Sequence, residues 1–254
     1  MLVSERHQYI LQRLKQDGRV VAKAISQELD VSEDTIRRDL RELASEGLLQ
    51  RVHGGALPAS PAMGNFAQRE TIHPQAKVAI GRKAASLIQP GQVIMLDGGT
   101  TAVQVARHLP PQLTATIVTH SPSIAVELVN HPHVDVILIG GRLFKHSIVS
   151  VGAAAIEAIQ RVRADLYFMG VTGIHPEVGL STGDYEEARV KHALSRQAAD
   201  TVVLASEEKL GAASPYVITP LTAASALIVN QTVPESVLVP YAEVGLDIIV
   251  AASS

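Results

Sequence analysis

Seven short apolar runs, separated by stretches with helical spacing, constrain the fold of this chain more than any other feature. Several runs are apolar nearly throughout, as in strands that are buried on both faces of a parallel sheet. The runs lie at 92–96, 115–119, 134–139, 165–171, 201–205, 225–229 and 246–250. Helices are predicted over 76–88, 101–108, 122–130, 152–160, 184–199 and 234–242. The alternation predicts a Rossmann-like, doubly wound α/β sheet that is mostly parallel.

The first 57 residues have a different pattern and predict a small separate domain. Helices are expected over 5–16, 22–29 and 33–46, each with apolar residues at helical spacing. Four residues, Leu29-Asp30-Val31-Ser32, connect the last two, and Ser32 stands where it would cap the third helix. Two short helices joined by a tight turn predict a helix-turn-helix unit.

Charges of opposite sign separate on the third predicted helix. Ile36, Leu40 and Leu43 form an apolar stripe along the helix. Arg37, Arg38 and Arg41 form a basic face on the opposite side. Asp39, Glu42 and Glu46 form a separate acidic group. Phosphates or a guanine edge would attract the basic face. A solvated amphipathic helix is the alternative, but mixed signs would suit simple solubility better. We therefore predict a helix that contacts DNA.

A short hairpin is predicted after this helix. Gly47 ends the helix, a strand follows, and Gly54-Gly55 forms a tight turn. Such a hairpin is the wing of a winged helix, from which Arg51 and His53 would reach the DNA backbone. Because aromatic residues make up 3% of the chain and tryptophan is absent, base stacking is disfavoured. Duplex DNA is thus preferred to single strands or RNA.

Composition sets the remaining boundaries. Residues 58–75 have little periodicity and are expected to be a linker to an α/β domain over 76–254. Cysteine is absent, which removes disulfides and thiolate metal sites. No apolar run approaches the roughly 18 residues of a membrane span, so we expect a cytoplasmic protein without membrane contact. The net charge of −3 identifies no partner.

Ligands of open α/β sheets bind beyond the carboxyl ends of the strands. The ends are Asp97-Gly98-Gly99-Thr100-Thr101, Thr119-His120-Ser121, Gly140-Gly141-Arg142, Gly170-Val171-Thr172-Gly173 and 206–209. In the first, glycines permit close approach, and the following helix exposes free N–H groups to an anion, most commonly phosphate. It is neither a P-loop nor a dinucleotide fingerprint. An ordinary strand-to-helix connection is the alternative.

Neighbouring charged residues favour a phosphorylated sugar. Asp184, Glu187, Lys191 and Lys209 would supply acids for sugar hydroxyls and cations for a phosphate. A routine surface ion pair is the alternative for Glu187 and Lys191, which lie four residues apart. His131 and His133 lack further ligands, so no metal and no cofactor are expected.

These motifs together resemble the DeoR family of bacterial transcriptional regulators. The head carries Ser32-Glu33-Asp34-Thr35-Ile36-Arg37-Arg38-Asp39-Leu40 and Arg51-Val52-His53-Gly54-Gly55-Ala56. By that resemblance, Thr35, Arg37 and Arg38 would enter or flank the major groove, and Arg51 and His53 would lie on the wing. The rest resembles the family's sensor domain in 97–101, 118–121, 140–141, 150–152, 165–173, Glu187 with Lys191, and 209–211. That domain is similar in fold to ribose-5-phosphate isomerase and glucosamine-6-phosphate deaminase.

The chain departs from the family pattern at two places. His120 stands where asparagine often precedes Ser121, and Ser206-Glu207-Glu208-Lys209 replaces an Asp-x-Ser-Lys run. Only Lys209 is retained there, and two extra carboxylates crowd it. The departures point to an unusual effector or to weakened phosphate binding.

We therefore expect a sequence-specific repressor of a carbohydrate-metabolism operon that binds double-stranded DNA as a dimer or tetramer. A phosphorylated sugar in the α/β domain would control it, by preferring an arrangement that cannot span two half-sites. One alternative is a sugar-phosphate isomerase or deaminase with a DNA-binding head, using Asp97, Asp184 or Glu187 as a general base. Another is an interaction module whose head binds protein.

Overall fold

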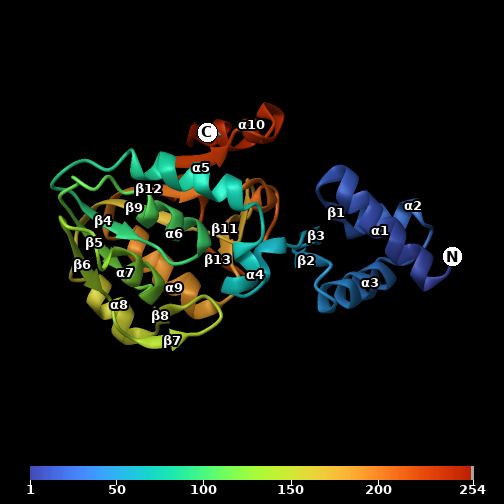
Figure 1. The fold of residues 1–254 in the computed structure, drawn as a ribbon. Helices are drawn as coiled ribbons and strands as arrows, with labels where there is room; N and C mark the ends of the chain where they lie inside the picture. Colours follow the sequence, from blue (N-terminus) through green and yellow to red (C-terminus); the bar gives the residue numbers. More distant parts are fainter. Residues whose placement is uncertain (253–254) are drawn as a thin grey trace.

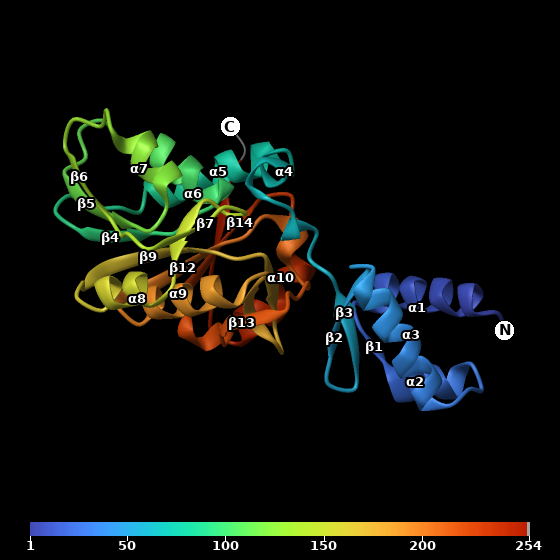
Figure 2. The same ribbon diagram turned by 90° about the horizontal axis from the view of Figure 1, so that it is seen from below.

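The computed structural model describes residues 1–252, which form a small head and a larger α/β domain. The head lies to one side and is joined to the α/β domain by the chain that follows strand β3 (Figures 1 and 2). None of the helices in the described chain is both long and apolar enough to cross a membrane.

The head is a winged helix-turn-helix, as predicted. Its elements are α1 (Val3–Asp17), β1 (Val20–Val21), α2 (Ala22–Glu28), α3 (Glu33–Ser45), β2 (Leu49–Val52) and β3 (Gly55–Pro58). The strands form an antiparallel sheet in the order β1-β3-β2. Ile10 of α1, Ile25 of α2 and Ile36 of α3 meet in one buried cluster. Packing of the three helices and the wing on this cluster fixes α3 relative to β2 and β3.

Residues 58–75, expected to be a linker, are structured. They contain a 3₁₀ helix, η1 (Pro61–Met63), and α4 (Phe66–Glu70), whose Asn65 and Gln68 form a reciprocal capping box. Helices this short show no 3.6-residue period, so neither was predicted from the sequence. Ser60 donates a hydrogen bond to the carbonyl of Thr172, which ties the segment to the α/β domain. The boundaries at 57 and 76 stay a prediction.

The α/β domain is built on one parallel sheet of seven strands, formed by the seven predicted runs. The strands are β4 (Val93–Leu96), β5 (Ala115–Thr119), β6 (Val134–Leu138), β9 (Ala164–Gly170), β12 (Ala198–Leu204), β14 (Ala226–Asn230) and β15 (Asp247–Ala251). Their order in the sheet is β15-β14-β12-β9-β4-β5-β6. The chain starts at β4, proceeds to β5 and β6, and then crosses to the other side of β4 with β9. The order therefore reverses between β4 and β9, which is the topological switch point.

Helices cover both faces of the sheet (Figure 2). One face carries α5 (Pro74–Ala85), α6 (Thr100–Arg107) and α7 (Pro122–Leu128), and the other carries α8 (Ala153–Ile159), α9 (Tyr185–Ser195) and α10 (Glu235–Glu243). Successive residues of a strand enter different cores: Ile94 faces the first layer and Met95 the second. Because both faces are covered, the strands are apolar nearly throughout.

The sequence did not predict the smaller β-structures around the sheet. They are the hairpin β7 (Arg142–Phe144) and β8 (Val149–Val151), and the antiparallel sheet of β10 (Gly173–His175), β11 (Gly179–Thr182) and β13 (Tyr216–Thr219). Two 3₁₀ turns, η2 (Glu207–Lys209) and η3 (Leu221–Ala223), complete the domain. Strands of three or four residues are too short to show a clear alternation.

Candidate functional site

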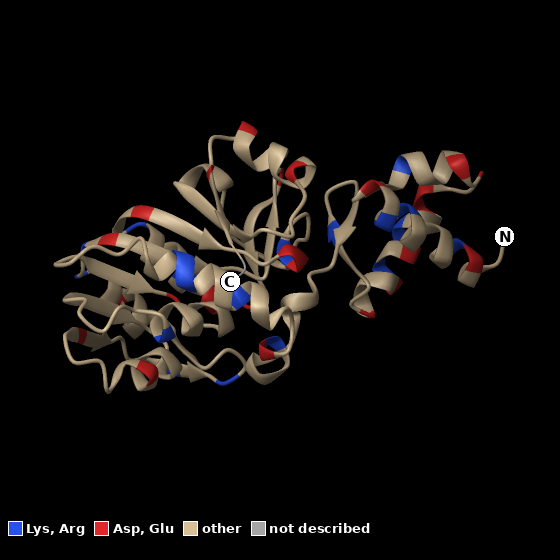
Figure 3. Cartoon of the chain, turned by 45° about the horizontal axis from the view of Figure 1, so that its top comes forward, with Lys and Arg blue, Asp and Glu red and all other residues tan. Residues whose placement is uncertain are grey.

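The third helix of the head presents an exposed basic face. Ser32 caps α3, because its hydroxyl accepts a hydrogen bond of 3.1 Å from the amide of Thr35. Arg37, Arg38 and Arg41 are all exposed. Arg37 forms an ion pair of 2.7 Å with Glu33 one turn earlier. Both signs of charge occur on the head (Figure 3), so the basic character belongs to this face and not to the whole domain.

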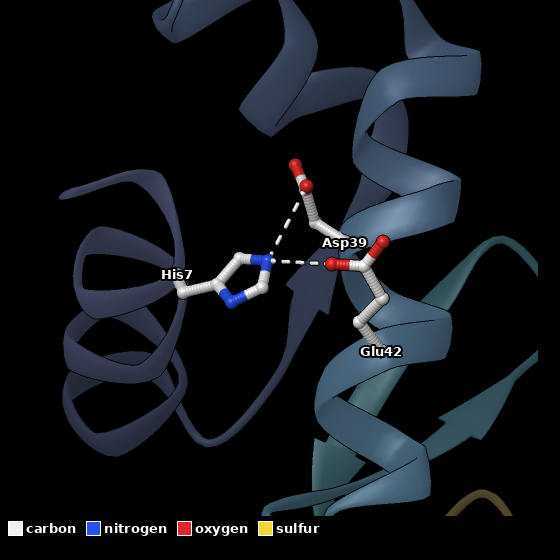
Figure 4. A group of neighbouring side chains, drawn as sticks. All are labelled: His7, Asp39 and Glu42. Atoms are coloured by element: carbon white, nitrogen blue, oxygen red, sulfur yellow. Dashed lines mark hydrogen bonds and ion pairs between the residues drawn. The ribbon is translucent and has the colours of Figure 1, made fainter. Parts of the chain in front are cut away.

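Asp39, which helical spacing groups with Glu42 and Glu46, differs from these two exposed residues in being buried. It is 1% exposed and accepts hydrogen bonds from Arg6 of α1, one of them 2.9 Å long from Nη2. His7 Nε2 lies 3.3 Å from Asp39 Oδ1 and 3.6 Å from Glu42 Oε2 (Figure 4). The three side chains could in principle surround a cation, but the guanidinium of Arg6 already occupies the Asp39 carboxylate. We interpret the group as an ion-pair network that fastens α1 to α3.

The wing is the β2–β3 hairpin. Arg51 lies opposite Ala56 and Val52 opposite Gly55, so His53 and Gly54 form the turn. Arg51 and His53 are both exposed. The hairpin thus displays on its surface the two side chains that were expected on the wing.

A pocket lies at the switch point, where the carboxyl ends of β4 and β9 meet. Its walls come from the loop after β4, the end of β9, helix α9, the turn η2 and the segment before α5. The lining residues are Ala62, Arg69, Ile72, Lys77, Gly98–Ala102, Ser147, Gly170–Thr172, Thr182, Glu187, Lys191, Glu208 and Lys209. Four of these side chains are cationic, and two are carboxylates.

The loop between β4 and α6 forms the floor of the pocket. Gly98 packs so closely that a Cβ atom there would lie 2.2 Å from Val149 Cγ1. Gly99 has a φ of +111°, which side-chain-bearing residues rarely adopt. The loop delivers the N-terminus of α6 to the pocket, and the buried hydroxyl of Thr101 there has no hydrogen-bond partner among residues 1–252. Free amide groups and an unpaired hydroxyl suit an anion.

Asp97 lies behind this loop and holds the site together. One carboxylate oxygen accepts hydrogen bonds from the Gly98 amide (2.8 Å) and from His120 Nε2 (2.9 Å). The other accepts from the Gly170 amide (2.8 Å) and from Lys191 Nζ (2.5 Å). Burial alone would raise the pKa of Asp97, but the charge of Lys191 and the His120 hydrogen bond hold it below its usual range. Asp97 therefore fixes Lys191 and joins β4 to β9.

Lys209 is the most unusual cation of the pocket. It is 6% exposed, and its ammonium group forms neither a hydrogen bond nor an ion pair with any described residue. Burial lowers its pKa to about 8, although the nearby carboxylate of Glu208 acts in the opposite direction. The ammonium nitrogen is not one of the fully buried unpaired atoms among the described residues, so it opens onto the pocket. There it can pair with an anion.

Two further cations line the pocket: Arg69, from the segment expected to be a linker, and Lys77, from the start of α5. Arg69 donates to Ser147 Oγ over 3.1 Å, while its Nε is buried without a partner among the described residues. Lys77 is 3% exposed and donates to the carbonyl of Arg69. Burial lowers the pKa of both side chains. Arg69 stands in the region without periodicity, and Lys77 stands in the helix predicted over 76–88, where nothing in the sequence marked it as a pocket residue.

The carboxylates of the pocket are Glu187 and Glu208. Glu187 is buried and accepts a hydrogen bond of 3.1 Å from Ser147 Oγ. It forms no ion pair with Lys191, which contacts Asp97 instead, so the surface-pair interpretation of these two residues is wrong. Glu208 accepts from Ser206 Oγ over 2.7 Å. Glu208 was not expected to be a site residue; it stood out only as a departure from the family pattern.

Several predicted site residues do not line the pocket. His120 is fully buried between Asp97 and the carbonyl of Ser150, and Ser121 is buried beside Ile148. Asp184 caps α9 through the Glu187 amide. Gly140 and Gly141 are exposed beyond β6, at the edge of the sheet. Both β5 and β6 lie on one side of β4, away from the crevice between β4 and β9.

Comparison with known proteins identifies both parts of the chain. Residues 6–61 match the model of the DeoR-like helix-turn-helix domain, and residues 72–231 match that of the DeoR C terminal sensor domain. The HTH-type transcriptional regulator GlpR of Haloferax volcanii is 39% identical over 83% of this chain and 83% of its own length. The HTH-type transcriptional regulator GolR of Listeria innocua is 31% identical over 99% of this chain and all of its own.

Two other relatives extend the comparison. The glycerol-3-phosphate regulon repressor of Escherichia coli is 33% identical over 83% of this chain and 84% of its own. Among solved structures, ribose 5-phosphate isomerase A of Methanocaldococcus jannaschii matches 52% of each chain at 19% identity, with a TM-score of 0.39. That likeness is too slight to support any conclusion about function. The two domain matches and the full-length similarity to GolR show that this chain belongs to the DeoR family of transcriptional regulators.

Proposed function

We propose that this regulator represses a carbohydrate-metabolism operon and that a phosphorylated sugar in the switch-point pocket releases it from DNA. The observation that carries the proposal is Lys209, a largely buried lysine whose ammonium group pairs with no described residue and opens onto a pocket beside a helix N-terminus. Relatives named as repressors include those of the glycerol-3-phosphate regulon and, putatively, of the aga operon in Escherichia coli. Their names support a repressor of carbohydrate or polyol-phosphate genes.

The charge balance of the pocket supports an anionic effector. Lys191 is neutralised by Asp97, which leaves the cations Arg69, Lys77 and Lys209 against the carboxylates Glu187 and Glu208. Three positive charges and two negative ones leave a formal excess of one positive charge. A phosphate monoester would compensate that excess, and the α6 N-terminus adds donors for its oxygens.

The segment between the domains offers a route from the pocket to the head. Arg69 and Ala62 line the pocket, and the same segment runs back to Pro58 at the end of wing strand β3. The Pro58 carbonyl accepts a hydrogen bond from the Ala213 amide, close to η2 in sequence. An effector that repositions Arg69 would thereby shift the head relative to the α/β domain. A coupling of about 1–3 kcal/mol changes DNA affinity roughly 5–150-fold.

The DNA-facing roles of Ser32, Thr35, Arg37, Arg38, Arg41, Arg51 and His53 are part of the proposal. Their place on α3 and the wing supports contact with the major groove and the flanking backbone. Two half-sites about one helical turn apart would require two heads, so we propose a homo-oligomer, a dimer or a tetramer. The α/β domain would supply its interface.

An enzyme is less well supported than a regulator. The relatives are transcriptional regulators, and the residues considered as a general base are engaged in the structure. All four hydrogen bonds to Asp97 stabilise its ionised form, and its low pKa makes it a weak base. Asp184 serves as a helix cap and Glu187 accepts from Ser147.

The proposal is tested by adding a panel of pentose, hexose and triose phosphates to the full-length protein. We expect one or more to raise the melting temperature without being consumed, and to lower the affinity for promoter fragments in fluorescence anisotropy. Turnover of a sugar phosphate would favour the enzyme. Failure to bind promoter DNA at low ionic strength, with or without these compounds, would refute the regulator.

A further inference from the structure

Three polar atoms of the pocket are buried and lack a hydrogen-bond partner among residues 1–252. They are Arg69 Nε, Thr101 Oγ1 and Glu208 Oε2. A buried polar atom without a partner costs about 1–3 kcal/mol, so a bound molecule that satisfies these atoms gains that energy. The hydrogen-bonding type of these three atoms therefore indicates which groups of a ligand the pocket can bind.

Glu208 needs a different ligand group from the one that Arg69 and Thr101 need. Arg69, Lys209 and the Thr101 hydroxyl can all donate to the oxygens of an anion. A carboxylate can only accept, and the phosphate of an effector offers it no donor. The unpaired oxygen of Glu208 must be satisfied by another part of the ligand.

The local structure fixes the direction of this acceptor. Glu208 belongs to the turn η2, and Ser206 donates to its Oε1 over 2.7 Å, which leaves the buried Oε2 without a hydrogen-bond partner among the described residues. The carboxylate of Glu208 is close enough to raise the pKa values of Lys77 and Lys209. Neither ammonium group, however, lies within the 4.0 Å of an ion pair with Glu208. Glu208 is therefore a free acceptor beside the proposed phosphate position.

The preceding residue shows the contrast. Glu207 has the same charge and lies in the same turn, but it contacts His73 Nδ1 (3.1 Å) and Thr232 Oγ1 (2.8 Å) on the surface. It does not line the pocket. Of the two extra carboxylates in this turn, only Glu208 lines the pocket.

We infer that Glu208 is a specificity-determining residue, which accepts a hydrogen bond from a hydroxyl group of the effector close to its phosphate. The inference rests on the proposed function and adds the chemistry that distinguishes one phosphate from another. A neutral hydroxyl fits better than an ammonium group, because Arg69, Lys77 and Lys209 would repel a second cation. A phosphate monoester without hydroxyl groups leaves Glu208 unsatisfied.

The test compares two phosphate monoesters on full-length protein by isothermal titration calorimetry. Methyl phosphate has no hydroxyl donor, and glycerol 3-phosphate has two; the tightest sugar phosphate of the panel above serves as a third probe. We expect the wild type to prefer the hydroxylated ligands. Glu208→Ala should reduce this preference about tenfold or more, since a hydrogen bond to a charged group contributes at least that much. Glu208→Gln should give an intermediate preference.

Glu207→Ala is the matched control, because it removes the same charge from the same turn and should keep the wild-type preference. If Glu208→Ala changes the affinity for all three ligands by one common factor, Glu208 acts through its charge alone and the inference is wrong. An unchanged preference overturns it as well. If wild-type protein binds no phosphate monoester, the proposed function itself fails, and that result is distinct from a loss of discrimination.

Discussion

Replacing Lys209 with methionine should stabilise the protein and at the same time abolish its response to phosphate monoesters. Lys209 is almost fully buried and has no partner among the described residues, so its charge opposes folding when no anion is bound. Methionine has a similar length and can occupy the same space without a charge. Stability and ligand binding are therefore expected to change in opposite directions.

The magnitude follows from the pKa of Lys209, which burial lowers from 10.5 to about 8. A tenfold change in proton affinity corresponds to about 1.4 kcal/mol, so the charged side chain destabilises the native state by about 3 kcal/mol at pH 7. Because the native pKa is the lower one, this cost is complete below pH 8 and disappears as the pH rises toward 10.5. The advantage of Lys209→Met should shrink over the same interval.

Urea unfolding at pH 6.5 and 9.5 measures the difference in free energy. Tryptophan is absent and four of the five tyrosines lie in the α/β domain, so tyrosine fluorescence follows that domain. A saturating phosphate monoester at 100 times its dissociation constant should stabilise the wild type by about 2.7 kcal/mol and leave the variant unchanged. Lys145→Met, at an exposed position, is the control. A variant that is less stable than wild type at pH 6.5, or that still responds to ligand, would refute the reasoning.

Three more perturbations test the other parts of the molecule. Substituting both Arg37 and Arg38 with alanine should weaken promoter binding and make the salt dependence shallower by about 0.9 for each lost phosphate contact; an unchanged slope in anisotropy titrations would remove this face from the DNA interface. Asp97→Asn should cost about 3–5 kcal/mol in urea unfolding, because Lys191 loses its buried partner, and a cost below about 1 kcal/mol would mean that the lysine finds another. Arg6→Ala should destabilise the head by a similar amount, since the buried Asp39 carboxylate keeps only its 3.3 Å contact with His7; amide hydrogen exchange of α1 and α3 reports it, and unaltered protection would contradict the expectation.

The head shows how much of a domain can be encoded locally. Ser32 caps α3, and Ile36, Leu40 and Leu43 form its buried stripe as the spacing predicts. The burial of Asp39 was not predicted, because helical spacing gives the angle of a residue but not the identity of what packs there. Arg6 lies 33 residues away, and only the packing of α1 on α3 brings its guanidinium to that carboxylate.

Predicting the full pocket would have required the order of the strands in the sheet, which periodicity along the sequence does not reveal. Strand ends pointed to Gly98, Gly99, Thr100, Thr101 and Lys209, and a charged helix pointed to Lys191; the structure places all of them in the wall of one pocket. The same procedure included Gly140 and Gly141, because every parallel strand has a carboxyl end and periodicity does not reveal which two ends adjoin the switch point. Arg69 was missed because its segment has no periodicity, and Lys77 because a predicted helix does not reveal which of its side chains reaches a pocket.

By itself, then, the sequence determined the elements that short-range interactions decide: buried strands, amphipathic helices, helix caps and the turn of the wing. The tertiary structure decided which distant residues meet. It placed β9 beside β4, brought Lys191 to Asp97 across 94 positions of the chain, and left Lys209 and Glu208 unpaired at one pocket. The physical reason is that side-chain periodicity records how an element is buried, whereas the neighbours of an element depend on the path of the whole chain.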